Sequence, residues 1–233
     1  MKKLILMTAI LVLTACGSNQ PGQRSASAPV KVQPPASDYA KDLTFPKKVY
    51  AMEYVSQHKY DDPIYGIQLR YAHDFSSSDI LDVYVYPIPA AEWEETLPLL
   101  REETKQVLAE IKMAVEQKHY QAATPGEIQE IELAGQKGVK TPLDLIINDG
   151  TPYQSFVYLF AQEDKFIKLR FSFLKGNGEG LPNGDSLAEE LIAKISVPKE
   201  SAYMHALREE HKKQQAQQLM QLLMQALEKQ ETE

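Results

Sequence analysis

Two short segments, YGIQLRY at residues 65–71 and LDVYVYP at residues 81–87, decide the fold of this chain. In both of them apolar and polar side chains alternate, which is the period of a strand with one buried face. The apolar faces are formed by Tyr65, Ile67, Leu69 and Tyr71 in the first segment and by Leu81, Val83 and Val85 in the second. The segment HDFSSSD between them is rich in residues that favour turns. The sequence therefore predicts two antiparallel strands joined by a loop.

Five further segments have strand-like patterns. They are residues 49–55, 127–135, 143–147, 155–161 and 166–173. The segment SFVYLFA is apolar on both faces, with Phe156, Tyr158 and Phe160 on one side and Val157 and Leu159 on the other, which predicts a central strand of a sheet covered on both sides. The following residues QEDK predict a tight turn into FIKLRFSF.

A helical period appears between residues 91 and 118. Apolar or small side chains recur there in steps of four and three: Trp93, Leu97, Leu100, Thr104, Val107, Ile111 and Ala114. Either this helix begins near Thr96 with Pro98 in its first turn, or it is kinked at Pro98. A second helix is predicted to start at the capping-box pattern of Ser186 and Glu189 and to end at Val197. The predicted fold class is α+β: an antiparallel sheet with a covering helix on each face, plus a long C-terminal helix.

The N-terminus carries a second signal. Lys2 and Lys3 precede an apolar run too short to span a bilayer, as in a secretory signal peptide. The residues LTAC at 13–16 resemble the lipobox of bacterial lipoproteins. The resemblance implies that Cys16 is acylated on its sulfur, becomes the first mature residue and is acylated again on its amine. Two or more acyl groups give stable membrane anchoring. The alternative is an ordinary signal peptide that happens to end beside a cysteine.

Four regions follow from these patterns. Residues 1–15 are predicted to be a lipoprotein signal peptide, 16–42 the acylated cysteine and a flexible tether, 43–198 the globular domain and 199–233 a Gln-rich helix. Cys16 is the only cysteine, which excludes an intrachain disulfide. Loss of Lys2 and Lys3 with the signal peptide changes the formal net charge from −7 to −9, which argues against nucleic acid as a partner.

The order of the predicted elements resembles that of the DcrB/PsbP-like sandwich. The hairpin of YGIQLRY and LDVYVYP and a last hairpin before a capped helix carry this resemblance over residues 43–198. Lipid-anchored bacterial members of that group are known. The resemblance implies a fold, and it assigns no functional residue.

Three loops contain residue types used in catalysis or ligand binding. The first holds His73, Asp74, Ser76, Ser77 and Ser78, the second His58, Asp61 and Asp62, and the third the glycine-rich run KGNGEG at 175–180. A catalytic triad needs groups from separated segments, the second loop lacks a metal-binding motif, and the third lacks the spacing of a phosphate-binding loop. We therefore predict no catalytic, cofactor or metal site in these loops.

The aromatic residues of the strands leave two interpretations open. Tyr84 and Tyr86 share a face with Asp82, while the aromatic side chains of residues 155–161 share another. Such faces are usually buried under a covering helix. Alternatively, aromatic side chains form a contact patch at an uncovered end of the sheet.

The C-terminal helix, predicted over residues 201–229, has a distal apolar stripe. It contains Leu219, Leu222, Leu223, Ala226 and Leu227, with Met220 and Met224 beside it. Either this stripe folds back on its own domain, or it contacts a partner through Leu219, Leu222, Leu223 and Leu227.

The sequence predicts a lipid-anchored, non-enzymatic accessory or binding module of the cell envelope. It would bind the membrane through the lipid on Cys16 and a protein partner through the sheet or the C-terminal helix, without a cofactor. The alternatives are a structural adaptor acting through the C-terminal helix and an envelope enzyme with an unrecognised site. Because Gly17 rather than Asp follows the cysteine, resemblance to Gram-negative sorting rules predicts the periplasmic face of the outer membrane.

Overall fold

The computed structural model describes residues 42–73, 76, 78–90, 93–94, 97–176, 183–199 and 202–230. Within helix 202–230, the side chains of 202–204, 207, 222–223 and 225–230 are outside this description. The predicted signal peptide, Cys16 and the tether up to residue 41 also lie outside it. Residues Pro34–Glu233 form one compact unit.

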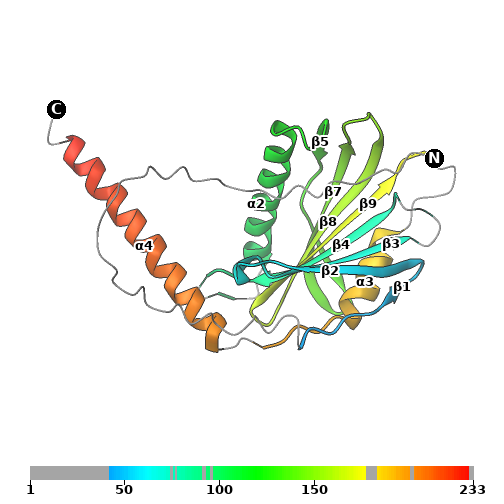
Figure 1. The fold of residues 1–233 in the computed structure, drawn as a ribbon, viewed down its shortest axis with the longest axis horizontal. Coiled ribbons are helices and arrows are strands. Elements are labelled where there is room, and N and C mark those ends of the chain that lie inside the picture. Colours follow the sequence, from blue (N-terminus) through cyan, green and yellow to red (C-terminus); the bar gives the residue numbers. More distant parts are fainter. Residues whose placement is uncertain are drawn as a thin grey trace, which may run out of the picture. The chain divides into compact units, whose positions relative to one another are not determined.

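The described residues form a mixed α/β fold around a curled antiparallel sheet of nine strands (Figure 1). Its order is β1-β2-β3-β4-β9-β8-β7-β5, and β6 also pairs with β7. The strands are β1 Lys48–Val49, β2 Met52–Lys59, β3 Ile67–His73, β4 Ile80–Pro87, β5 Ala122–Pro125, β6 Gln129–Leu133, β7 Gln136–Ile146, β8 Pro152–Gln162 and β9 Lys165–Leu174. The predicted mixed class and antiparallel sheet are confirmed, while the sequence suggested seven strands rather than nine.

The hairpin of β3 and β4 has the predicted alternation from Ile67 onward, whereas Tyr65, predicted on the same buried face, lies before β3 and is 63% exposed. Leu69 pairs with Val83 and faces the core, and Arg70 pairs with Asp82 on the opposite face. A short 3-10 helix, η1 Pro63–Tyr65, precedes β3. Strand β8 lies between β7 and β9, as its two apolar faces predicted, and β8 turns into β9 through the predicted tight reversal.

Strand β7 begins seven residues earlier than the sequence suggested, and Pro142 explains the difference. It lies inside the strand at the point where the outer neighbour of β7 changes from β6 to β5. Proline has no N–H to donate, so it is tolerated where the ladder on one side is interrupted. On that side, the Pro142 carbonyl accepts a hydrogen bond from the Gly126 N–H at 2.8 Å.

The first described helix, α2 Leu97–Glu116, packs on β7 and β8. It begins one residue before Pro98, which confirms the interpretation that places this proline in the first turn. Val107 and Ile111 contact Leu143 and Val157 of the sheet. The buried Thr104 hydroxyl donates to the Leu100 carbonyl at 2.8 Å, which satisfies it inside the apolar interface.

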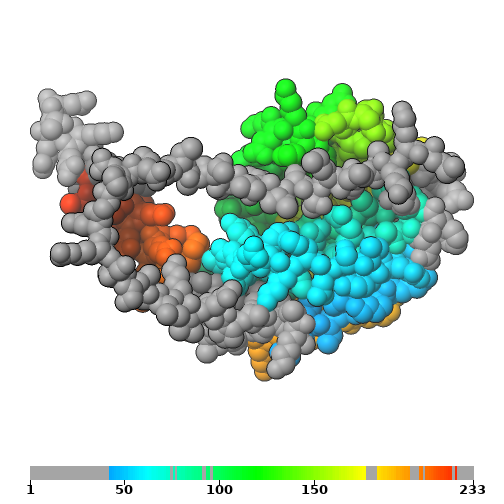
Figure 2. Space-filling model, viewed as in Figure 1, coloured from blue at the N-terminus to red at the C-terminus, as the bar shows by residue number. Residues whose placement is uncertain are grey.

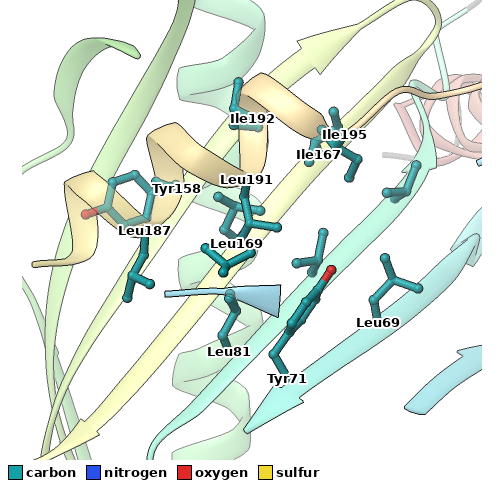
Figure 3. Close-up of a cluster of buried hydrophobic side chains, with 14 of the residues drawn as sticks. Leu69, Tyr71, Leu81, Tyr158, Ile167, Leu169, Leu187, Leu191, Ile192 and Ile195 are labelled. Carbon is teal, nitrogen blue, oxygen red and sulfur yellow. The ribbon is translucent and has the colours of Figure 1, made fainter. Parts of the chain in front are cut away.

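Helix α3 Gly184–Lys194 covers the other side of the strands, where it forms the main core (Figure 3). Its predicted start at Ser186 was wrong, because Asn183 is the N-cap. The Asn183 side chain accepts from the N–H groups of Asp185 and Ser186 at 3.0 and 3.3 Å. Leu187 and Leu191 pack in the cluster that contains Tyr158 and Phe160 of β8 and Phe171 and Phe173 of β9. On this face, therefore, Tyr158 and Phe160 belong to the core, and the partly buried Phe156 packs against it.

Helix α4 Ala202–Gln230 is attached to the sheet by a buried ionic cluster. Asp164, in the β8–β9 turn, binds Lys165 Nζ at 2.5 Å through Oδ1 and Arg208 Nη2 at 2.7 Å through Oδ2. Lys165 Nζ also donates to the Pro198 carbonyl at 2.6 Å. All three charged residues are buried. No apolar stripe in the sequence indicates this contact, because it joins charged residues 44 positions apart.

No helix among the described residues has the length and apolar character needed to cross a membrane.

Candidate functional site: a tyrosine–cation face

The sheet surface beside α2 is divided into an apolar part and a polar part. Strands β7 and β8 present Val139, Leu143, Val157 and Leu159, which are buried in the clusters that include α2. On β3, β4 and β9 the same surface carries charged and aromatic side chains. Arg70 of β3 pairs with Asp82 of β4, and Asp82 pairs with Arg170 of β9. We define the tyrosine–cation face by Tyr60, Arg70, Tyr84, Tyr120, Lys168 and Arg170, all of them partly exposed.

The open edge of this surface is strand β2. Ser56 pairs with Arg70 and His58 with Gln68, so both lie on the side of the tyrosine–cation face, and both are exposed. Among described strands, β1 covers only the beginning of β2. Figure 2 shows the blue and cyan atoms of this first part of the sheet on the side turned toward the viewer. Among the described residues, the face is therefore exposed along this edge.

Arg70 and Asp82 form the rigid base of the face. Arg70 Nε donates to Asp82 Oδ1 and Nη2 to Oδ2, both at 2.8 Å, a bidentate geometry between neighbouring strands. This hydrogen bonding with Asp82 is the main reason that the pKa of Arg70 is raised. Both carboxylate oxygens of the buried Asp82 are engaged by Arg70, so the pair positions the face without offering a free charge.

Lys168 lies between tyrosine rings. Its Nζ is 4.6 Å from the ring centroid of Tyr84 and 5.4 Å from that of Tyr86, which are cation–π distances. Burial lowers the pKa of Lys168, although the charges of Glu110 and Glu103 oppose this effect. A folded-state pKa below the unfolded value means that the unfolded chain binds the proton more tightly. The free energy of unfolding therefore rises with pH between the folded-state and the unfolded-state pKa of Lys168. At neutral pH, where Lys168 is charged, its burial destabilises the fold.

Arg170 is oriented by Tyr120, which lies just after α2. Arg170 Nη2 donates to the Tyr120 hydroxyl at 3.1 Å, and the guanidinium carbon is 5.4 Å from the ring centroid. Within the described part of the chain, neither Lys168 nor Arg170 has a carboxylate within ion-pair distance. Two oriented cations thus project two residues apart from the same side of β9.

A tyrosine–carboxyl contact closes the face toward α2. The Tyr86 hydroxyl donates to Glu103 Oε1 at 2.7 Å. Burial raises the pKa of Tyr86 and also that of Glu103, whose hydrogen bond with Tyr86 acts in the opposite direction. Burial likewise raises the pKa of Tyr84, so these tyrosines remain protonated and able to donate at neutral pH.

The sequence indicated only part of this site. It placed Tyr84 and Tyr86 on one face with Asp82, and the structure brings these three residues together on the α2 side. It missed Tyr60, Tyr120 and the two cations of β9, because they come from separate segments. The available signal was the polar side of FIKLRFSF, where a lysine and an arginine alternate with core residues.

Those residues of the three loops that the structure describes make local contacts. His58 packs edge-to-face on Tyr60 with ring centroids 4.7 Å apart, and Asp62 accepts from the Ile64 N–H at 3.0 Å to cap η1. Asp74, Ser77 and residues 177–180 lie outside the described part of the chain. Across the residues that the structure describes, no group of three or more His, Cys, Asp or Glu side chains is arranged to hold a metal ion.

The distal part of α4 exposes apolar side chains. Leu219, Met220 and Met224 have 60%, 62% and 55% of their surface exposed. The side chains of Leu222, Leu223 and Leu227, which the sequence also suggested as partner contacts, are outside the description.

No protein-family model matches the sequence, and no curated protein matches it either. The solved structures that match the chain include the following three. A protein from Bacteroides thetaiotaomicron VPI-5482 is 15% identical, with a TM-score of 0.38, and the match covers 64% of this chain but 45% of that one. Cyanobacterial PsbP (CyanoP) from Synechocystis sp. PCC 6803 is 11% identical, with a TM-score of 0.44, covering 75% and 98%. PA94, a protein of unknown function from Pseudomonas aeruginosa, is 9% identical, with a TM-score of 0.36, covering 64% and 99%. One of these structures is thus a PsbP protein, and identities this low carry no function.

Proposed function

We propose that this protein is a lipid-anchored, non-enzymatic binding module of the bacterial cell envelope, which contacts a protein partner through its tyrosine–cation face. The observation that carries the proposal is the division of one sheet surface into an apolar part under α2 and a partly exposed part rich in tyrosine and arginine. Tyrosine and arginine are enriched in the energetically dominant parts of protein interfaces. The proposal includes a PsbP-like sandwich as the fold and the periplasmic side of the outer membrane as the location.

Loss of two tyrosines should test the face. In the Tyr60→Ala/Tyr120→Ala double variant we expect the amount of partner co-purified from solubilised envelopes to fall by about tenfold or more, since interface tyrosines are frequent hot spots. Tyr50→Ala is the matched control, because Tyr50 is 61% exposed in the β1–β2 connection and contributes nothing to the face. Equal recovery of the partner by the double variant and the control would contradict the proposal.

Anchoring is tested at Cys16, which the lipobox resemblance assigns as the acylated residue. The Cys16→Ser variant should remain unprocessed or leave the detergent-soluble membrane fraction, because no thiol is left to carry the lipid. The measurement is fractionation together with electrophoretic size. A variant that stays in membranes at the mature size would show that the anchor is not at this cysteine.

An adaptor function through α4 is the second candidate, favoured by the exposed Leu219, Met220 and Met224. Ending the protein after Lys212 removes this segment but keeps Arg208 and its contact with Asp164. We expect an unchanged thermal unfolding midpoint, because the buried Arg208–Asp164 contact that attaches α4 to the sheet is kept. If the partner is still recovered, the adaptor function fails, and if the partner is lost, the face is not its main contact.

A further inference from the structure

We infer that Lys168 and Arg170 bind a carboxylate of the partner, presented over the sheet between Tyr84 and Tyr120. The inference rests on the proposed binding function and gives the chemistry of the group that is recognised. That group is either an acidic side chain or the free carboxyl terminus of the partner, since both present the same planar oxygen pair.

Lys168 and Arg170 differ from other cations of the sheet in the groups that they contact. Lys140, Lys165 and Arg70 have carboxylate partners at 2.7, 2.5 and 2.8 Å. Lys168 and Arg170 are also partly buried, yet within the described residues they contact tyrosines instead of carboxylates. For Lys168, Glu103 and Glu110 offset the cost of burial only through space, so no carboxylate among the described residues bonds either cation directly.

Lys168 and Arg170 are also placed to act on one ligand. Residues two apart on a strand point to the same face, so both cations project together from β9. Arg170 is held by the Tyr120 hydroxyl and Lys168 by the rings of Tyr84 and Tyr86, so little ordering is needed when an anion arrives. A guanidinium matches the two oxygens of a carboxylate, and an ammonium adds a point charge beside it.

The negative charges around the two cations bear on which anion can bind. Glu103 and Glu110 act electrostatically on Lys168 from α2, and Asp82 is already bound to Arg70. These carboxylates repel an incoming anion, and they repel a doubly charged phosphate more strongly than a singly charged carboxylate.

The test is a titration of the detergent-solubilised full-length protein, followed by NMR of labelled lysine and arginine side chains. The probes are acetyl-Gly-Glu-Gly-amide, acetyl-Gly-Gln-Gly with a free carboxyl terminus, acetyl-Gly-Gln-Gly-amide and inorganic phosphate. We expect the Lys168 and Arg170 signals to shift with one or both carboxylate probes. The amide peptide should have no effect, and phosphate should bind more weakly. The comparison of the first two probes identifies a side-chain or a C-terminal carboxylate.

Variants complete the test. Lys168→Gln and Arg170→Gln should each weaken binding of the carboxylate probe about tenfold, whereas Lys112→Gln, an exposed change of equal charge on α2, should not. Lys168→Gln should also keep or raise the thermal midpoint, which a purely structural lysine would not do. Unchanged binding in both variants, or equal binding of the amide peptide or phosphate, would overturn the inference. A partner still captured through the face would then show that only the carboxylate assignment had failed.

Discussion

Replacing Asp164 with alanine is expected to lower the free energy of unfolding by about 3–5 kcal/mol, the cost of breaking a buried ion pair from one side. Asp164 lies between two buried cations, Lys165 at 2.5 Å and Arg208 at 2.7 Å. Without its carboxylate, two like charges would face each other in a region of low dielectric constant. Chemical denaturation of the full-length variant and the parent protein measures the loss.

Asp144→Ala is the matched control for this prediction. Asp144 also accepts from a lysine, Lys175, at 2.6 Å, but the Asp144 side chain is 61% exposed. An exposed pair of this kind contributes at most about 1 kcal/mol. Similar losses in the two variants would mean that burial does not make the Asp164 cluster important, and that α4 is not fixed to the sheet by it.

Replacing Gly66 with alanine should cost more than about 2 kcal/mol, through backbone strain and a steric clash together. Gly66 follows η1 with φ +66° and ψ −128°, a conformation that side chains with a Cβ rarely adopt. A Cβ built there would lie 1.9 Å from the Val85 carbonyl oxygen in the neighbouring strand β4. Because the obstacle is backbone, the strands themselves would have to move.

Gly135→Ala separates the two causes. Gly135 also has a positive φ, +75°, but a Cβ there would meet nothing within 4 Å. We expect a loss of about 1 kcal/mol from strain alone, measured by the same denaturation experiment. If both glycine variants lose equal stability, the close packing of the η1 region against β4 is not a constraint on the fold.

The alternation of strands and the helical period were enough to predict the elements whose buried faces are set by neighbouring residues. The alternation in β3 and β4 and the stripe of Leu100, Thr104, Val107 and Ile111 were sufficient to predict a hairpin and a helix with the correct buried faces. Strand β5 was missed, because Ala122–Pro125 has neither alternation nor β-branched runs. The early part of β7 was missed because Pro142 interrupts its pattern, although the strand continues through it.

The candidate site was harder to predict than the fold. Lys168 and Arg170 occupy the polar positions of an alternating strand, which normally indicate solvent exposure. They contact tyrosines of β4 and of the turn after α2. These contacts depend on the sheet order, in which β9 lies between β8 and β4, and β4 is far from β9 in the sequence. The Arg208–Asp164 contact has the same origin, since no local period links the two residues.

The central claim is that the partner binds the side of the sheet that carries the tyrosine–cation face. Ser56 and Gln57 are exposed neighbours on the edge strand β2, and their pairing with Arg70 and Leu69 places them on opposite sides of the sheet. A photo-crosslinking amino acid at each position, irradiated in intact envelopes, therefore tests the claim most directly. We expect a defined crosslinked product from position 56 and little or none from position 57. Strong crosslinking from position 57, with none from position 56, would contradict the proposed binding face.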